Sequence, residues 1–358
     1  MASETLRVAV VGLGFGARVQ LPVFTDHPRT TVVSVCSRTI EHARAAATQF
    51  AIPHYTDDYR KSVTRSDVDL VSVVTPPALH APVTLAALRA RKNVLCEKPF
   101  AKSTREAQRM VTAAKRAQRV GMLDHEFRYI PVRMRAKSLV DDGWLGDLER
   151  IVVVEATTWM HPSSTLRFGW HSKAVEGGGV LGALGSHYID YCRWLAGDVK
   201  EVSATLQTRV AKRSQASGTA ARVDADDNFS LCMTMASGAL ATIDLCATAN
   251  SQFSSVYMSG TKGALIIRDD NELLGLRAGH EAVPVTAPAR YPRRLAGGHR
   301  LIGPFYTLVT ELLAHLNGEA STVPTFEDGL RVQEVLDAAR RSAKSGRIVT
   351  LRAPRKRR

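Results

Sequence analysis

The run Glu97-Lys98-Pro99 carries residue types that proton chemistry requires. The amine of Lys98 can take or give a proton, and its charge can stabilise a negative oxygen atom. The run follows the apolar segment Asn93–Cys96, which is typical of a buried strand. Ligands of parallel sheets bind beyond the carboxyl ends of the strands. Lys98 is therefore either a catalytic residue, with Glu97 holding the backbone or a cofactor beside it, or part of a surface salt bridge at the end of a strand.

His187 is a second group suited to acid–base chemistry, because an imidazole changes its charge close to neutral pH. It stands near the start of an apolar helix predicted over residues 186–195. A glycine-rich run that starts at Gly177 precedes it, and glycines let a segment approach other groups closely. His125, after the predicted strand Val120–Leu123, is either a further acid or base or a buried structural histidine.

A glycine-rich turn between the apolar run Leu6–Val11 and a predicted helix is suited to binding phosphate groups. Gly12 and Gly14 occupy the first two positions of the pattern G-x-G-x-x-G/A, and Ala17 occupies the third. The first glycine allows the tight turn, and the second lets the backbone approach a pyrophosphate. The small third residue lets the helix pack on the strand. We predict that a dinucleotide contacts the turn residues Gly12, Gly14, Phe15, Gly16 and Ala17.

The end of the second predicted strand indicates which dinucleotide binds. Proteins that bind NAD have Asp or Glu there, which accepts hydrogen bonds from the ribose hydroxyls. This chain has Ser37 and Arg38 instead. A hydroxyl and a guanidinium fork suit the additional phosphate of NADP. We predict NADP as the cofactor, and the alternative is NAD, with Arg38 as an exposed residue after a strand.

The elements that must position these groups divide the chain into two parts. From residue 6 to about 124, strand-like runs alternate with amphipathic helices, which indicates a doubly wound (Rossmann) parallel sheet. After a linking helix that begins at Pro131, most predicted elements are strands, which indicates a largely antiparallel open sheet with helices on one face. The predicted fold class is α/β plus α+β. We predict a dinucleotide-binding Rossmann domain over 1–127, a substrate-binding and oligomerisation domain over 128–352 and a basic tail over 353–358.

Composition argues against several other classes of protein. The 45% of hydrophobic and 23% of charged residues are ordinary for a soluble globular protein. No apolar run approaches the ~18 residues that span a bilayer, and no signal peptide is recognisable, which predicts a cytoplasmic protein with no membrane partner. The formal net charge of +14 comes from dispersed residues without a nucleic-acid-binding motif, so we predict no nucleic-acid partner. The five cysteines are scattered, which predicts buried reduced thiols and no metal site.

The chain contains, in this order, the Gly12 turn, Glu97-Lys98-Pro99, and Gly177-Gly178-Gly179 followed by His187. This arrangement resembles the glucose-fructose oxidoreductase / inositol dehydrogenase (Gfo/Idh/MocA) family. The resemblance covers essentially the whole chain, as far as Phe326-Glu327-Asp328-Gly329 and the last helix. It implies an NAD(P)-dependent oxidoreductase that transfers hydride between a nicotinamide cofactor and a sugar, cyclic polyol or related carbinol or ketone. Lys98 and His187 would be its catalytic residues. It also implies a homodimer or homotetramer formed through a sheet face of the second domain.

The resemblance adds contacts that the motifs alone do not supply. In the family, the loop after residues 69–74 passes the nicotinamide ribose, which makes Thr75, Pro76 and His80 candidates for cofactor binding. His80 is equally well a structural residue at a helix end. Arg128 matches an arginine usual in the family, and it joins His125 and Trp170 as a predicted substrate contact.

The chain departs from the family pattern at Ala183, where an aspartate usually stands four residues before the histidine. Without that carboxylate, Lys98 and His187 would share the proton transfer. The alternative is a catalytically silent, cofactor-binding regulator of the same fold. Nucleic-acid binding through the basic surface is a third hypothesis.

Overall fold

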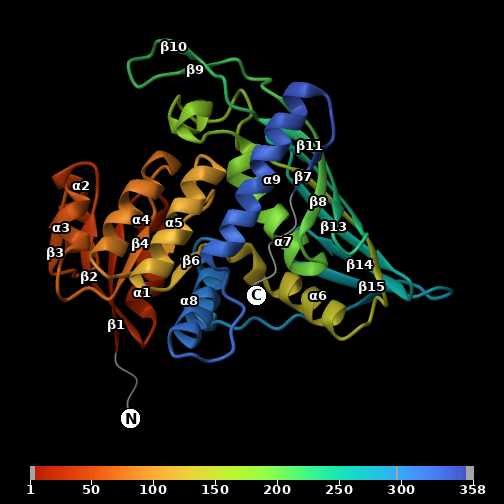
Figure 1. The fold of residues 1–358 in the computed structure, drawn as a ribbon, viewed down its shortest axis with the longest axis horizontal. Helices are drawn as coiled ribbons and strands as arrows, with labels where there is room; N and C mark the ends of the chain where they lie inside the picture. Colours follow the sequence, from red (N-terminus) through yellow and green to blue (C-terminus); the bar gives the residue numbers. More distant parts are fainter. Residues whose placement is uncertain (1–4, 296, 352–358) are drawn as a thin grey trace. The chain divides into compact units, whose positions relative to one another are not determined.

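The computed structural model describes residues 5–295 and 297–351 (Figure 1). Contacts within the chain divide it into two compact units. The first extends to Tyr129 and includes Ala289–Leu330, and the second consists of Ile130–Pro288 and the chain from Arg331 onward. The predicted basic tail, 353–358, lies outside the described residues.

The first unit is built on a six-stranded parallel sheet with the strand order β3-β2-β1-β4-β5-β6. The order changes direction between β1 and β4, which lie side by side. Beyond the carboxyl ends of strands at such a switch point, doubly wound sheets bind their ligands. The strands are β1 (Leu6–Val11), β2 (Thr30–Cys36), β3 (His54–Thr56), β4 (Leu70–Val73), β5 (Asn93–Cys96) and β6 (Gly121–Leu123).

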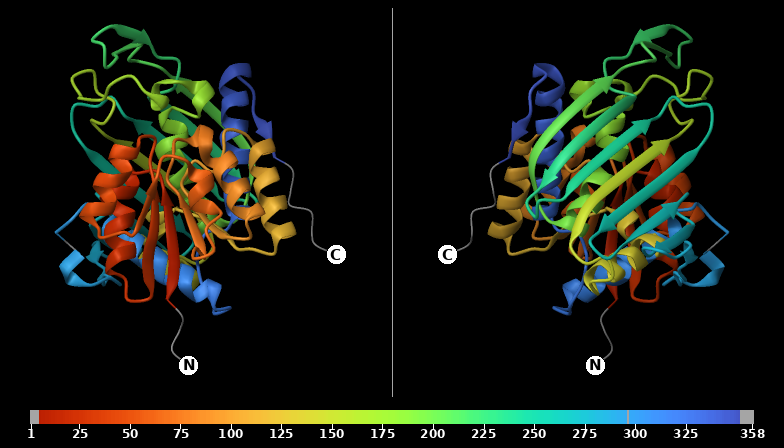
Figure 2. Two further views of the ribbon diagram at one scale, coloured as in Figure 1. Left: turned by 90° about the vertical axis from the view of Figure 1, so that its left-hand side faces the viewer. Right: turned by 90° about the vertical axis from the view of Figure 1, so that its right-hand side faces the viewer.

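Helices lie on both sides of this sheet, as the left view of Figure 2 shows, so the predicted Rossmann fold is confirmed. They form because apolar residues recur at helical spacing and are buried on one side. In α5, for example, Ala107, Met110, Val111 and Ala114 are buried, and Ser103 caps the helix by accepting from the Glu106 N–H at 3.3 Å. The helical elements are η1 (Gly16–Gln20), α1 (Leu21–Asp26), α2 (Ile40–Gln49), α3 (Tyr59–Val63), η2 (Pro77–Leu79), α4 (His80–Arg89), α5 (Thr104–Ala117), η3 (Glu126–Tyr129), η7 (Arg293–Leu295) and α8 (Ile302–Leu316).

The second unit contains a nine-stranded sheet with the order β16-β15-β14-β13-β7-β12-β11-β8-β17. Only the pair β12 and β7 is parallel among these strands. Burial alternates along β11, where Phe229 and Leu231 are buried and Ser230 and Cys232 are exposed, so one face of the sheet carries the core. The strands are β7 (Leu148–Ala156), β8 (Val199–Gln207), β11 (Asn228–Met235), β12 (Leu240–Cys246), β13 (Phe253–Gly260), β14 (Gly263–Arg268), β15 (Glu272–Leu276), β16 (Val283–Pro284) and β17 (Val349–Thr350).

Helices α6 (Pro131–Asp141) and α7 (Ser186–Ala196) pack against strands of this sheet, and α9 (Phe326–Ser345) runs from the first unit into the second. The right view of Figure 2 shows the strands of the sheet face on. A separate hairpin, β9 (Lys212–Ser214) and β10 (Ala220–Arg222), lies outside the sheet. The short helical turns are η4 (Trp170–Ser172), η5 (Ala174–Glu176) and η6 (Leu181–Gly185). The largely antiparallel second part of the predicted fold is confirmed.

Short elements were missing from the prediction because they contain few apolar residues in a row. They include β3 and α3 in the first unit and β16 in the second. The prediction that all cysteines are buried was wrong for Cys232, which is exposed on the open face of β11, and Cys246 is only partly buried. In a strand with one exposed face, every second side chain points away from the core, which explains the exposure of both cysteines.

A buried ionic network holds α7 in the second unit. Arg133, on α6, is fully buried, and its Nε donates to Asp270 Oδ1 at 2.7 Å. Its Nη2 donates to the Tyr188 hydroxyl at 3.1 Å, and the guanidinium lies over the rings of Tyr188 and Tyr191. The Tyr188 hydroxyl donates in turn to Glu155 on β7, at 2.5 Å. The network therefore ties α7 both to α6 and to the sheet.

Weakening this network should lower the stability of the protein. We expect Asp270→Asn to lower the free energy of unfolding by about 3 kcal/mol, because it removes the charge that pairs with buried Arg133. The matched change Glu272→Gln affects an exposed pair with Arg268, at 3.5 Å, and should cost less than about 1 kcal/mol. Urea unfolding followed by circular dichroism measures both. Equal losses in the two variants would contradict the role of Asp270.

Candidate active site

The predicted dinucleotide turn lies at the carboxyl end of β1. Gly12 has φ +109°, and a Cβ there would lie 2.3 Å from the carbonyl oxygen of Val74, so only glycine fits. A Cβ on Gly14 would meet no described atom within 4 Å, which leaves its backbone open to a ligand. Gly16 packs against the sheet, since its Cβ would lie 3.4 Å from Val10 Cγ1. The close packing that was predicted at Ala17 is thus made one residue earlier.

The helical segment that opens after this turn can receive an anion. It begins with η1, which continues directly into α1. In the described structure no side chain bonds to its first N–H groups, and its first turn contains no acidic residue. Unpaired N–H groups and the positive end of the helix dipole attract phosphate. The ring of Phe15 stands edge-on to His299, with centroids 6.0 Å apart.

The end of β2 carries Ser37 and Arg38, as predicted, and Arg38 is exposed. The hydroxyl of Ser37 lies 3.4 Å from His42 Nδ1. Two acidic residues beside this strand end were not predicted. They follow β3, a strand that was itself not predicted and whose residue Thr56 pairs with Cys36. They are Asp57 and Asp58. Burial, and then the charges of Asp58 and Asp57, raises the pKa of the Cys36 thiol to about 12, so negative charge is present beside this strand end.

His80, the first residue of α4, is fully buried and bridges two loops. Its Nδ1 lies 2.9 Å from the carbonyl oxygen of Pro99, and its Nε2 lies 2.8 Å from that of Thr75. Burial lowers the pKa of His80, and the hydrogen bonds to these carbonyls oppose that shift. Both ring nitrogens therefore face the protein, and the geometry gives His80 a positioning role between the Thr75 loop and the Lys98 turn. Pro76 is exposed on the same loop.

Lys98 follows β5, and the peptide bond between Lys98 and Pro99 is cis. The Lys98 N–H donates to Glu97 Oε2 at 3.2 Å, so Glu97 holds the backbone of the turn, as predicted. Glu97 is itself buried, and its Oε1 accepts from Gln20 Nε2 at 3.1 Å. The same Nε2 donates to Asp124 Oδ2 at 2.8 Å, and Gln20 Oε1 accepts from the Ser72 hydroxyl at 2.5 Å. One amide thus connects the ends of β4, β5 and β6.

Three carboxyl groups gather beside Lys98, and we call Glu97, Asp124 and Glu126 the carboxyl cluster. All three are buried, and Gln20 Nε2 donates to both Glu97 and Asp124. Burial, together with the charge of Glu97, raises the pKa of Glu126 to about 7, although the Lys98 ammonium opposes the shift. Burial and the charges of both glutamates hold the pKa of Asp124 well above its usual range. Burial likewise raises the pKa of Glu97, and Lys98 opposes this.

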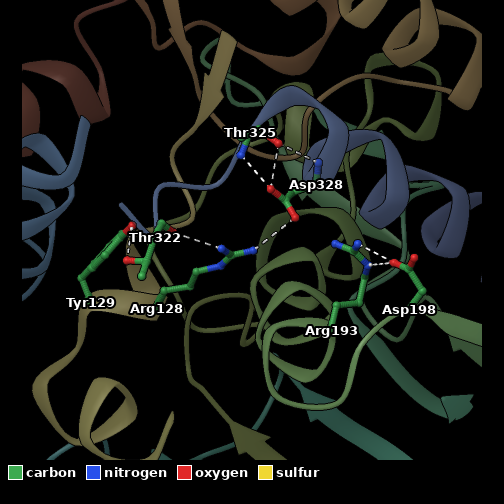
Figure 3. A network of polar contacts seen from close by, with 7 residues as sticks. All are labelled: Arg128, Tyr129, Arg193, Asp198, Thr322, Thr325 and Asp328. Atoms are coloured by element: carbon green, nitrogen blue, oxygen red, sulfur yellow. Dashed lines mark hydrogen bonds and ion pairs between the residues drawn. The ribbon is translucent and has the colours of Figure 1, made fainter. Parts of the chain in front are cut away.

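Two predicted substrate contacts, His125 and Arg128, lie in the segment that follows β6. Both are buried, and Figure 3 shows Arg128 with its partners in the first unit. Arg128 Nη1 donates to the carbonyl oxygen of Thr322 at 3.3 Å, and Nη2 lies 3.7 Å from Asp328 Oδ1. Asp328 also accepts from the Thr325 N–H at 2.8 Å, at the start of α9. Arg128 thus fixes the start of α9, and its contact with substrate stays a prediction.

His187 belongs to the second unit, where it lies near the start of α7 with 1% of its surface exposed. Ala183 is also buried, one helical turn earlier on η6. The space beside the glycine run that precedes them is occupied by other atoms of the protein. A Cβ on Gly178 would lie 2.5 Å from the carbonyl oxygen of Trp170, and one on Gly179, with φ +101°, would lie 2.2 Å from Asp226 Oδ1. These glycines serve packing around the turn that carries Trp170.

Asp226, between β10 and β11, was not predicted, although it is hydrogen-bonded to the first residue of η6. Its Oδ2 accepts from the Leu181 N–H at 2.7 Å, and its backbone carbonyl accepts from the Val180 N–H at 2.9 Å. Burial raises the pKa of this carboxyl. The prediction of site residues also did not include Gln20, Asp124 and Glu126. Only their polarity within apolar surroundings could have drawn attention to them in the sequence.

Comparisons with known proteins agree with this geometry. Residues 6–125 match the family model described as "Oxidoreductase family, NAD-binding Rossmann fold", and residues 134–266 match the "GFO/IDH/MocA C-terminal domain". The chain therefore belongs to the Gfo/Idh/MocA family, and it is an oxidoreductase with a nicotinamide-dinucleotide-binding fold. In the part of the chain that the structure describes, no helix has the length and apolar character to cross a membrane.

Among its relatives is the levoglucosan dehydrogenase of Pseudarthrobacter phenanthrenivorans, which is 29% identical over 289 residues, or 74% of this chain and 73% of the relative. A solved structure of a levoglucosan dehydrogenase with NADH and L-sorbose has a TM-score of 0.87 at 25% identity, covering 97% of this chain and 99% of that one. The aldose-aldose oxidoreductase of Caulobacter crescentus has a TM-score of 0.80 at 27% identity, covering 97% and 100%.

The raised pKa of Glu126 makes a prediction about stability and pH. A carboxyl whose pKa is higher in the folded protein binds more protons there than when unfolded, so its contribution to stability falls between about pH 5 and pH 8. Glu126→Gln removes this loss. Its free energy of unfolding should therefore rise relative to the unmodified protein by on the order of 2 kcal/mol across that range.

Urea unfolding at each pH measures the free energy of unfolding of both proteins. The contribution of the histidines is the same in both proteins, so it drops out of the difference. The matched control is Glu41→Gln, at an exposed carboxyl in the first turn of α2, and its difference should not change with pH. Parallel pH curves for Glu126→Gln and the unmodified protein would contradict the prediction.

Proposed function

We propose that this protein is an NADP-preferring oxidoreductase that transfers hydride between the nicotinamide ring and a carbinol or ketone carbon of a sugar, cyclic polyol or derivative. The observation that carries the proposal is the position of Lys98 beside Glu97, at the carboxyl end of β5 in the sheet whose β1 ends in the open Gly14 turn. The solved relatives with NADH and L-sorbose, and the aldose-aldose oxidoreductase, support a carbohydrate as the substrate class.

The residues present fit a dinucleotide. The backbone of the turn 12–17 would receive the pyrophosphate, and Ser37 with Arg38 would receive the 2′-phosphate. Thr75 and Pro76 would lie along the nicotinamide ribose, with His80 fixing their loop. When bound, the nicotinamide ring accepts or supplies the hydride.

The chain's own residues would handle the proton. The Lys98 amine would take the hydroxyl proton during oxidation, or return it during reduction, and its charge would stabilise the oxygen as the bond to hydrogen changes. His187 would be the second acid or base, because Ala183 offers no carboxylate. His125, Arg128 and Trp170 remain candidate substrate contacts.

The remaining predictions belong to the same proposal. We infer a dinucleotide-binding domain over 1–127 and a substrate-binding and oligomerisation domain over 128–352. The exposed apolar side chains Val154, Leu240 and Phe253 on the large sheet support a homodimer or homotetramer formed through that sheet. The protein would act in the cytoplasm. Static light scattering of the purified chain tests the assembly.

A second candidate function is a cofactor-binding regulator without turnover, which the loss of the family aspartate at Ala183 favours. Such a protein would bind the dinucleotide but reduce none of it with any sugar or polyol. A panel of sugars and polyols, followed by absorbance of the reduced nicotinamide, separates the two functions.

Lys98 is the first residue to test. We expect Lys98→Met to lower kcat at least ~100-fold, because the substrate oxygen loses its proton acceptor and its stabilising charge. Cofactor affinity should change far less, as judged by quenching of tryptophan fluorescence. The matched change Lys61→Met, at an exposed position on α3, should leave kcat unaltered. A Lys98→Met enzyme with full turnover would refute the assignment.

Cofactor choice is the second test. The additional phosphate of NADP carries nearly two negative charges, and one charge-assisted contact is worth roughly 1.5–3 kcal/mol, so we expect ~10- to 100-fold tighter binding of NADP than of NAD. Ser37→Asp should reverse the preference, because its carboxylate repels the phosphate and accepts from the ribose hydroxyls.

Titration with both cofactors, followed by tryptophan fluorescence, measures the ratio. The control Ser251→Asp places the same charge at an exposed position of the second unit and should leave the ratio unchanged. Tighter binding of NAD by the unmodified protein would overturn the NADP assignment, and Asp57 would then be a candidate partner of the ribose.

A further inference from the structure

A later part of the chain folds onto the dinucleotide-binding unit. Ala289–Leu330 belongs to the first unit by its contacts, although most of the second unit precedes it in the sequence. We call the described residues within 291–306 the strap, which comprises η7 and the start of α8. Helix α8 contacts both η1 and α1, the helical segment behind the glycine turn. The strap therefore lies next to the segment that is expected to receive pyrophosphate.

Both arms of the strap are anchored to α1. On the first arm, the Arg294 guanidinium donates to Asp26 at the end of α1, from Nε to Oδ1 at 3.0 Å and from Nη2 to Oδ2 at 2.8 Å. On the second arm, at the start of α8, the ring of Phe305 stands edge-on to the ring of Phe24, with centroids 5.4 Å apart. Both of these phenylalanines are fully buried. The fold therefore fixes the residues between the two arms from both sides.

The residues between the two arms lie beside the glycine turn. The ring of His299 stands edge-on to the ring of Phe15, with centroids 6.0 Å apart. Phe15 precedes η1, whereas Asp26, the partner of Arg294, ends α1, so the first arm runs along this helical segment toward the turn. The next residue, Arg300, is thereby presented at the edge of the sheet where β1 ends.

Arg300 extends along that edge. Its guanidinium lies 5.5 Å from the ring centroid of Phe127, which follows β6. Strands β4 and β5 lie between β1 and β6 in the sheet. Arg300 therefore joins the turn after β1 to the segment after β6. Doubly wound sheets bind their ligands at this edge, with the pyrophosphate at the turn after the first strand.

Positive charge accumulates where the strap meets the glycine turn. Arg18 lies on η1, and in the described structure the first turns of η1 and α8 contain no acidic residue. Partial burial lowers the pKa of the His299 imidazole, and the charges of Arg18 and Arg300 lower it further. Helix stability does not explain Arg300, because the helix dipole disfavours a cation just before the start of α8. A bound anion would offset the repulsion between these groups.

We propose that Arg300 binds the pyrophosphate of the dinucleotide and that the strap positions it for this contact. This rests on the proposed function, which places a dinucleotide at the turn after β1. The N–H groups at the start of η1 would receive some of the pyrophosphate oxygens, and Arg300 would receive others, because a guanidinium fork binds two oxygens at once. An arginine far from the glycine motif in sequence would thus complete the phosphate site.

Calorimetric titration with ADP-ribose tests the contact without turnover. ADP-ribose carries the pyrophosphate but neither the 2′-phosphate nor the nicotinamide ring, so the result does not depend on the choice between NADP and NAD. We expect Arg300→Gln to weaken binding about 10- to 100-fold, the range for one lost charge-assisted hydrogen bond. Arg300→Lys should recover part of the affinity, because an ammonium keeps the charge but lacks the fork. The matched control Arg293→Gln removes the same charge from an exposed position on η7 and should bind ADP-ribose like the unmodified protein.

The outcomes separate this proposal from the proposed function. Equal affinity of Arg300→Gln and the unmodified protein for ADP-ribose would overturn the contact. A raised KM for the sugar with unchanged affinity for ADP-ribose would also overturn it, because Arg300 would then bind the substrate. If no sugar or polyol is turned over but Arg300→Gln still weakens ADP-ribose binding, the proposed substrate class fails and the phosphate contact stands. Arg300 is exposed, so both variants should keep the fold, which circular dichroism checks.

Discussion

The side-chain amide of Gln20 is the contact on which the first unit's site depends. It comes from the helical segment behind the glycine turn and reaches the ends of three other strands through Ser72, Glu97 and Asp124. Each of these groups is buried, so water cannot replace a lost bond, and the amide is costly to remove. The turn expected to hold pyrophosphate and the turn that carries Lys98 are thereby kept in one arrangement.

His80 provides a second tie at the same edge of the sheet. Its ring joins the carbonyl of Thr75 to that of Pro99, so the loop after β4 and the turn after β5 move together. Burial lowers the pKa of the imidazole, and the hydrogen bonds to the two carbonyl oxygens, which need a proton on each ring nitrogen, oppose that shift. Gln20 and His80 explain why this edge carries buried polar side chains at all.

The sequence predicted the fold well because the fold depends on repetition. Apolar strands alternating with helices indicated the parallel sheet. Gly12, Glu97-Lys98-Pro99 and His187 marked the ends of elements at which the candidate site residues lie. The carboxyl cluster could not be predicted, since Glu97 lies 27 residues before Asp124 and 29 residues before Glu126 along the chain. Only the pairing of β5 with β6 brings them together. Long-range partners of this kind have no local pattern, because they depend on strand order.

The two glycine-rich runs also show what a sequence motif leaves undetermined and what the structure adds. In sequence, the runs at Gly12–Gly16 and Gly177–Gly179 look equivalent, since both remove side chains before a helix. In the structure, a side chain at Gly14 would point into open space, whereas one at Gly178 would strike the carbonyl of Trp170. The first glycine leaves room for a ligand, and the second leaves room for the protein's own backbone. The role of a glycine in a binding turn therefore depends on what would occupy its missing Cβ, which requires the neighbouring loop as well as the motif.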